Sequence, residues 1–199
     1  MIKPTILDFL RHGEVSGGSY FRGVTDDPLT EQGWGQMYRQ CGEGRWDVVV
    51  SSPLRRCSSF ALAWTEQHQG TLLIDADWAE IDFGDWEGLT ADQIAASQPG
   101  ALEAYYSDPL SYTPPNAESY ALFCKRVAAG IDKICREYAG RSVLVVTHGG
   151  VIRAVFSELL AITPPQSFQI DVPHGCMSRF SCFQNGDNRF AQLNFHRPI

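Results

Sequence analysis

The fold is decided by one stretch near the start of the chain, Thr5-Ile6-Leu7-Asp8-Phe9-Leu10-Arg11-His12-Gly13-Glu14. This run is mostly apolar, has the length of a strand and breaks at a glycine, with Arg11 and His12 at its carboxyl end. Open α/β sheets bind ligands at that end of their strands. An imidazole there can act as a nucleophile, while the adjoining guanidinium holds an anion through paired N–H donors. Phosphate is the anion that suits this pair of groups.

An arginine and a histidine at a strand end can also be an ordinary surface pair, but the pattern occurs a second time. Residues 142–150, Ser-Val-Leu-Val-Val-Thr-His-Gly-Gly, again form an apolar run that ends in His148 and Gly149. If the two strands are neighbours in a parallel sheet, both imidazoles lie in one crevice. The amide groups of a helix that starts near Gly149 would point at the same anion.

A third run of this kind, Trp46 to Ser52, is followed by Pro53-Leu54-Arg55-Arg56. Proline suits the first turn of a helix, so a helix is predicted over residues 53–69. Its two adjacent arginines project about 100° apart around the helix axis. Only one of them can therefore point readily at the anion.

The composition predicts a single domain over residues 1–199. The chain has 199 residues, 44% of them hydrophobic, and no Pro/Gly/Ser-rich linker divides it. The formal charge of -7 and the pI near 5.1 argue against nucleic-acid or anionic-membrane partners. An anionic small molecule must therefore be attracted by a local cluster of arginines.

The six cysteines are dispersed through helix-like and strand-like runs, and no signal peptide precedes them. This usage favours a reducing, cytoplasmic location over a disulfide framework. Neither a Cys-x-x-Cys pair nor a His-Glu-x-x-His helix occurs, so we expect no metal and no cofactor. No apolar stretch approaches the length of a membrane span. No motif predicts the oligomeric state.

Glu80 is the candidate general acid. It opens the segment Glu80-Ile81-Asp82-Phe83-Gly84-Asp85-Trp86-Glu87-Gly88, and a carboxyl group among aromatic side chains can retain a proton near neutrality. The alternative is that Glu80 only pairs with a neighbouring arginine. For Asp82 and Glu87 we expect structural roles, with their carboxylates bonded to backbone N–H groups.

Two irregular segments flank the expected site. The glycine-rich residues 15–23 form either a plain surface loop or a wall in which Arg22 contacts the anion or the substrate. Residues 105–119 are aromatic, proline-rich and long for a connection, which indicates a lid or substrate loop within residues 100–119. Its tyrosines can either stack on a planar ring or pack on the core. His68, His174 and His196 have no motif partner and are expected to be surface or packing residues.

Taken together and in this order, the motifs resemble those of the histidine phosphatase superfamily, in its phosphoglycerate mutase-like branch. The similar pieces cover about residues 5 to 155: Arg11–Glu14, Pro28–Gly33, Ser51–Arg56, Glu80–Gly88 and Thr147–Gly150. The resemblance implies a three-layer, doubly wound α/β fold, with a mostly parallel sheet, helices on both faces and, from the Asn185-Gly186 turn signal, a C-terminal hairpin. It also implies a phosphohistidine on His12, acid–base catalysis by Glu80, and phosphoryl binding by the remaining basic and glycine residues of the motifs, namely Arg11, Arg56, His148 and Gly149.

Within that family, segments such as Phe21-Arg22-Gly23 and Thr25 to Thr30 are most similar to the α-ribazole phosphatases. This similarity implies hydrolysis of α-ribazole 5′-phosphate in the assembly of the cobalamin nucleotide loop. A broad sugar-phosphate phosphatase is the first alternative, followed by a phosphoglycerate mutase and a non-catalytic phosphate-binding module. The chain departs from the family at Gly17 and Gly18, where relatives commonly have asparagine, and at Asn116-Ala117 in the substrate loop.

Overall fold

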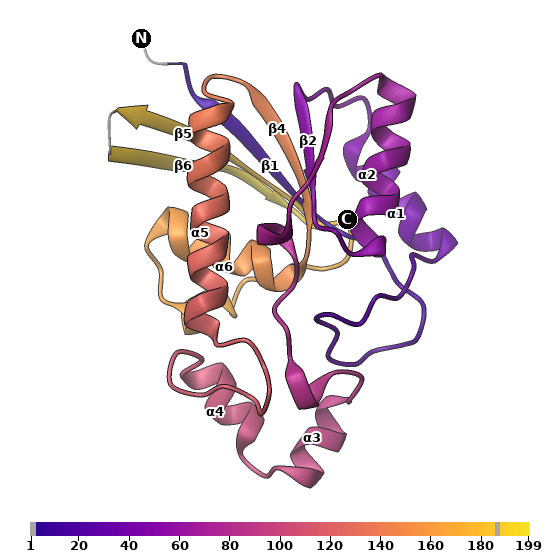
Figure 1. Ribbon diagram of the computed structural model, residues 1–199, viewed down its shortest axis with the longest axis vertical. Helices are drawn as coiled ribbons and strands as arrows, with labels where there is room; N and C mark the ends of the chain where they lie inside the picture. The colour runs from indigo at the N-terminus through magenta and orange to yellow at the C-terminus, as the bar shows by residue number, and fades with distance from the viewer. Residues whose placement is uncertain (1–2, 186–187) are drawn as a thin grey trace.

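A computed structural model describes residues 3–185 and 188–199, which are built around one six-stranded sheet with the order β3-β2-β4-β1-β5-β6 (Figure 1). The strands are β1 (Thr5–Arg11), β2 (Val48–Ser51), β3 (Leu72–Ile74), β4 (Ser142–Thr147), β5 (Met177–Asn185) and β6 (Asn188–Arg197). The first four strands in sequence pair in parallel, whereas β5 pairs antiparallel with β1 and with β6. The mostly parallel sheet and the C-terminal hairpin are thus confirmed. Of the expected Asn185-Gly186 turn, Gly186 lies outside the described residues.

Several helices begin at a residue whose side chain caps the first turn. The helices are α1 (Glu31–Cys41), α2 (Arg55–His68), α3 (Ala91–Ser97), α4 (Ala101–Ser107), α5 (Tyr120–Glu137), α6 (Gly149–Leu160) and α7 (Pro164–Ser167), with 3₁₀ turns η1 (Ala76–Trp78) and η2 (Gly84–Trp86). The Thr30 hydroxyl accepts the Gly33 amide at the start of α1. Thr90 and Gln93 form a capping box at the start of α3.

Helices cover both faces of the sheet, as the three-layer prediction requires (Figure 1). Successive strand residues point to opposite faces, so Leu10 packs with buried residues of α1 and α2, whereas Phe9 packs with those of α5 and α6. Each face therefore has its own apolar core. The carboxyl ends of the parallel strands stay free to carry a site.

Helices α3 and α4 lie apart from the sheet, beyond the carboxyl ends of β1 and β4 (Figure 1). Here the expectation of an irregular loop from residue 105 is corrected, because α4 occupies residues 101–107. Gly100, in the left-handed conformation with φ 81°, precedes a run of good helix formers, Ala101-Leu102-Glu103-Ala104. The irregular connection is confined to residues 108–119.

Candidate active site

The two motif histidines leave adjacent strands side by side. In the parallel β1–β4 ladder Arg11 is opposite Thr147, so the next residues, His12 and His148, emerge together at the carboxyl ends. The amide of His12 donates to the Thr147 carbonyl at 2.8 Å. The centroids of the two imidazole rings are 5.2 Å apart. Strand register alone thus brings together two residues that are far apart in sequence.

The tautomer of His12 follows from its hydrogen bond. Its Nδ1 lies 2.8 Å from the carbonyl oxygen of Gly13, and a carbonyl can only accept, so Nδ1 carries the proton. The lone pair of Nε2 is therefore free. Burial, and then the charges of Arg11 and Arg56, lower the pKa of His12 well below its ordinary value. The imidazole is held neutral, in the form that can attack phosphorus.

His148 and Arg56 are completely buried beside His12. Arg56 donates from Nε to Nδ1 of His148 at 3.2 Å, and the other ring nitrogen, Nε2, lies 2.7 Å from the Ser52 hydroxyl. Burial, followed by the charge of Arg56, lowers the pKa of His148 well below its ordinary value. Neither side chain lines the surface pocket that His12 shares with Arg11 and Glu80. Direct contact of Arg56 and His148 with a phosphoryl group therefore stays a prediction.

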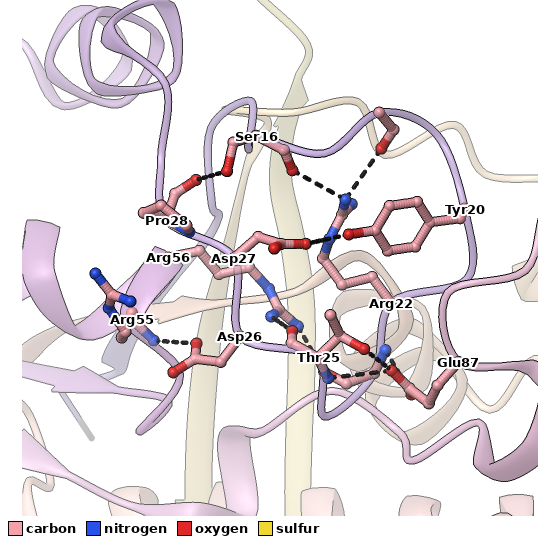
Figure 2. A network of polar contacts seen from close by, with 12 residues as sticks. Ser16, Tyr20, Arg22, Thr25, Asp26, Asp27, Pro28, Arg55, Arg56 and Glu87 are labelled. Atoms are coloured by element: carbon pink, nitrogen blue, oxygen red, sulfur yellow. Dashed lines mark hydrogen bonds and ion pairs between the residues drawn. The ribbon is translucent and has the colours of Figure 1, made fainter.

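The loop of residues 23–25 packs against Arg56, and both its backbone amides and its backbone carbonyls are held by side chains (Figure 2). The Glu87 carboxylate accepts the amides of Gly23 and Thr25 at 2.8 and 3.1 Å. Arg56 donates to the carbonyls of the same two residues at 2.8 and 2.6 Å. The expected structural roles of Glu87 and Asp82 are confirmed by these bonds and by the Gly84 amide, which donates to Asp82 at 2.8 Å.

Arg22 lines the pocket, but its charge is already paired (Figure 2). Its Nε lies 2.8 Å from Oδ2 of Asp27, which also accepts a hydrogen bond from the Tyr20 hydroxyl. Its Nη2 donates to the carbonyls of Ser16 and Gly18 at 3.1 and 3.0 Å. Arg22 thus shapes this wall of the pocket, and contact with substrate stays a prediction.

Glu80 is fixed through its backbone and its side chain. Oε2 accepts the Gly150 amide at 2.9 Å, and Oε1 accepts the Ile81 amide at 3.1 Å. The sequence predicted that the first-turn amides of α6 point at the anion. One of them, the Gly150 amide, is bonded to Glu80 instead. Arg126 of α5 donates to the carbonyls of Asp77, Ala79 and Glu80, and pairs with Glu118 at 2.8 Å. The carboxyl group is thereby aimed into the pocket.

The pocket is small and is lined by two arginines, of which Arg22 is paired with Asp27 and Arg11 is not. It has a volume of about 280 Å³, with His12, Arg11 and Glu80 among its lining residues. Arg11 donates to the Val172 carbonyl at 2.6 Å, but its buried Nε has no hydrogen-bond partner. In the described part of the chain, neither Arg11 nor Arg56 forms an ion pair. In a chain of net charge -7, two guanidinium groups without ion pairs that act on His12 are the feature that the expected anion site requires.

Two residues at the site were missed by the sequence analysis. His174, expected to be a surface or packing residue, has its ring 5.3 Å from that of His12 and so packs against the candidate nucleophile. It lies three residues before the start of β5, and no motif marks it. Arg153 lies one helical turn beyond Gly149 and next to the pocket, and that spacing was a usable signal.

In residues 3–185 and 188–199, no group of three or more His, Cys, Asp or Glu side chains is arranged to hold a metal ion. Within the same residues, no helix combines the length and apolar character needed to cross a bilayer.

The model of the histidine phosphatase superfamily (branch 1) matches residues 7–196. The chain belongs to this family. The expected family is thus confirmed.

Three relatives illustrate the range of this family. A bifunctional protein of Mycobacterium tuberculosis is 38% identical over 151 residues, which are 73% of this chain and only 41% of that protein. A solved mycobacterial glucosyl-3-phosphoglycerate phosphatase in complex with VO3 has a TM-score of 0.86 and 27% identity, covering 96% of this chain and 97% of its own. An adenosylcobalamin/alpha-ribazole phosphatase of Salmonella typhimurium is 27% identical over 177 residues, 86% of this chain and 88% of that protein. The α-ribazole phosphatases are thus among the relatives, but the similarity does not single them out.

Proposed function

We propose that this histidine phosphatase hydrolyses small-molecule phosphate monoesters through a phosphohistidine on His12. The observation that carries the proposal is the neutral His12 imidazole, with Nε2 free, in a pocket that it shares with Arg11 and Glu80. Uncatalysed hydrolysis of such esters is so slow that the barrier must fall by about 20 kcal/mol or more. Fixed positive charge around the phosphoryl group supplies most of this reduction.

Nε2 of His12 attacks phosphorus, a P–N bond forms, and the P–O bond to the leaving group breaks. Glu80 gives its proton to the departing oxygen. Glu80 then removes a proton from water, which attacks phosphorus and breaks the P–N bond, so that phosphate and free His12 are released. Arg11, Arg56 and His148 stabilise the charge on the phosphoryl oxygens, with Gly149 and Arg22 at the border of the site. These groups supply nucleophile, acid and charge, so the proposed route uses no metal and no cofactor.

The first candidate substrate is α-ribazole 5′-phosphate, an intermediate in the assembly of the cobalamin nucleotide loop. The walls next to Arg11 and Glu80 are aromatic and include Phe21, Phe83 and Tyr106. Such walls suit a planar bicyclic ring. The similarity to an adenosylcobalamin/alpha-ribazole phosphatase supports this assignment.

The second candidate is a phosphate ester of an acidic sugar derivative. The chain is 32% identical over 169 residues to a glucosyl-3-phosphoglycerate phosphatase of Mycobacterium tuberculosis. The glycerate moiety in that name carries a carboxylate. Arg153, which lines the hollow beyond Glu80, offers a cation for such a group.

We also propose a cytoplasmic enzyme with no nucleic-acid or membrane partner. All six cysteines are free thiols, as suits a reducing compartment. The acidic charge of the chain is unfavourable for binding polyanions.

The test combines a panel of phosphate esters with trapping of the intermediate. The panel contains α-ribazole 5′-phosphate, phosphoglycerate and fructose phosphates, and rapid acid-free quenching after addition of labelled substrate detects a base-stable phosphoenzyme. We expect labelling and turnover to vanish in His12→Ala and to persist in His68→Ala, since His68 stacks on Trp64 of α2. An active His12→Ala variant would overturn the proposal. Isomerisation of phosphoglycerate would show a mutase, binding of phosphate without turnover a non-catalytic module, and equal rates on all esters a broad phosphatase.

A further inference from the structure

Arg153 is a cation next to the active site that takes no part in the proposed bond-breaking and proton-transfer steps. It lies on α6, and its Nε donates to the Ile170 carbonyl at 3.3 Å. None of the carboxylates in residues 3–185 and 188–199 forms an ion pair with it. A half-buried guanidinium with one neutral acceptor retains most of its capacity to bind an anion.

Arg11 and Arg153 converge on one point above Gly149. A Cβ atom on Gly149 would lie 3.3 Å from Nε of Arg11 and 3.5 Å from Nη1 of Arg153. The Nε of Arg11 is buried and has no hydrogen-bond partner. Two guanidinium groups this close repel each other, and an anion between or beside them offsets that repulsion. Glu80 lines the same hollow and its charge acts on Arg11, but in the described residues it forms no ion pair with either arginine.

The positions of the two arginines assign them different parts of a substrate. Arg11 lines both the pocket that contains His12 and the adjoining hollow of about 220 Å³. Arg153 lines only the hollow, next to Tyr106 and Phe168. A phosphoryl group on His12 therefore lies within reach of Arg11, and Arg153 faces the group attached to the phosphate.

We infer that Arg153 binds a second anionic group, carried by the leaving group of the substrate, and so selects phosphate esters of acidic alcohols. This inference rests on the proposed phosphatase activity. The planar fork of an arginine pairs with a carboxylate or with a second phosphate through two parallel hydrogen bonds. An ester with a neutral leaving group gives Arg153 no anionic partner. The selection arises from the resulting difference in binding free energy between acidic and neutral esters.

Matched substrate pairs test the inference. 3-Phosphoglycerate and glycerol 3-phosphate differ by a carboxylate, and fructose 1,6-bisphosphate and fructose 6-phosphate differ by a phosphate. kcat/KM is measured for the native enzyme, for Arg153→Gln and Arg153→Lys, and for Arg136→Gln as a control on the exposed end of α5. Circular dichroism and Tm confirm that each variant is folded.

We expect the native enzyme to favour the acidic member of at least one pair by about tenfold or more. Which pair responds identifies the anion as carboxylate or phosphate. Arg153→Gln should remove that preference by slowing only the acidic member, Arg153→Lys should retain part of it, and Arg136→Gln should keep all of it. Equal losses on both members, or no preference in the native enzyme, would overturn the inference while leaving the phosphatase proposal intact. A native enzyme that hydrolyses no ester would instead refute the proposed function.

Discussion

The backbone amide of Gly150 donates a 2.9 Å hydrogen bond to Oε2 of Glu80. Gly150 is the second residue of α6, and the N-cap of that helix is His148. The segment that delivers the second histidine thus also holds the candidate general acid. This contact fixes the distance between the proposed phosphoryl site and the proposed proton donor.

Substitution Gly150→Ala should impair proton donation without unfolding the protein. A Cβ at this position would lie 2.3 Å from Oε1 of Glu80, so the carboxylate must move. Alanine favours a helix, so α6 itself does not suffer. We expect kcat on alkyl phosphates to fall by about 10- to 100-fold. On p-nitrophenyl phosphate, whose leaving group needs no proton, the loss should be much smaller.

Gly35→Ala is the matched control, because a Cβ there has no atom within 4 Å. That variant should keep full activity on both esters and an unchanged or slightly higher Tm. Equal losses for Gly150→Ala on the two esters would show that Glu80 is not the proton donor.

Replacing Arg126 should loosen the segment that carries Glu80. Arg126 donates to three backbone carbonyls of residues 77–80 and forms a forked pair with Glu118, with bonds of 2.8 and 2.9 Å. Arg126→Lys cannot reproduce this geometry. We expect the free energy of unfolding in urea to fall by about 1–3 kcal/mol. The remaining activity should depend more steeply on the pKa of the leaving group.

Lys125→Ala, at the exposed neighbouring position, serves as the control for Arg126. An Arg126→Lys enzyme that loses stability but keeps the native dependence on the leaving group would limit Arg126 to a purely structural role.

The substitution Glu87→Gln tests whether the loop at residues 23–25 supports Arg56. The Glu87 carboxylate accepts amide hydrogens from this loop and from Phe83, and the amide of glutamine replaces one acceptor oxygen with a donor. We expect a loss of about 1.5–3 kcal/mol of unfolding free energy, and a higher KM. Glu103→Gln on α4 is exposed and should change neither quantity. A double-mutant cycle with Arg56→Lys that gives additive losses would refute the coupling.

The pH dependence of stability should reflect the buried histidines. Burial, and then the charges of Arg11 and Arg22, lower the pKa of His174 from 6.5 to about 4. Between these values the unfolded chain binds the proton and the folded chain does not, so stability is lost as the pH falls below about 6.5. His12 and His148 are shifted in the same direction.

Urea titrations at several pH values from 4 to 7 measure this slope. His174→Gln should reduce this slope in that window, while the part that comes from His12 and His148 should remain. Superimposable slopes for the native protein and His174→Gln would contradict the assigned cause.

The sequence by itself determined the parts of this protein that depend on local pattern. Apolar runs that end in His12-Gly13 and His148-Gly149 specified two strands and the end at which they carry chemistry, because strand ends and glycine turns are encoded within a few residues. The order of five motifs then specified the family. Gly100 followed by Ala101-Leu102 is a helix-start signal for α4, but the prolines later in the segment led to the prediction of a loop from residue 105.

Only the tertiary structure decided which other groups share the site with His12. His174 reaches it because β5 pairs antiparallel with β1, and the Gly175 amide donates to the His12 carbonyl at 3.1 Å. Arg56 and His148 are 92 residues apart in the chain, and they share a hydrogen bond because the ends of β2 and β4 are adjacent. Such pairings are set by the burial and register of whole strands, which no short stretch of sequence contains.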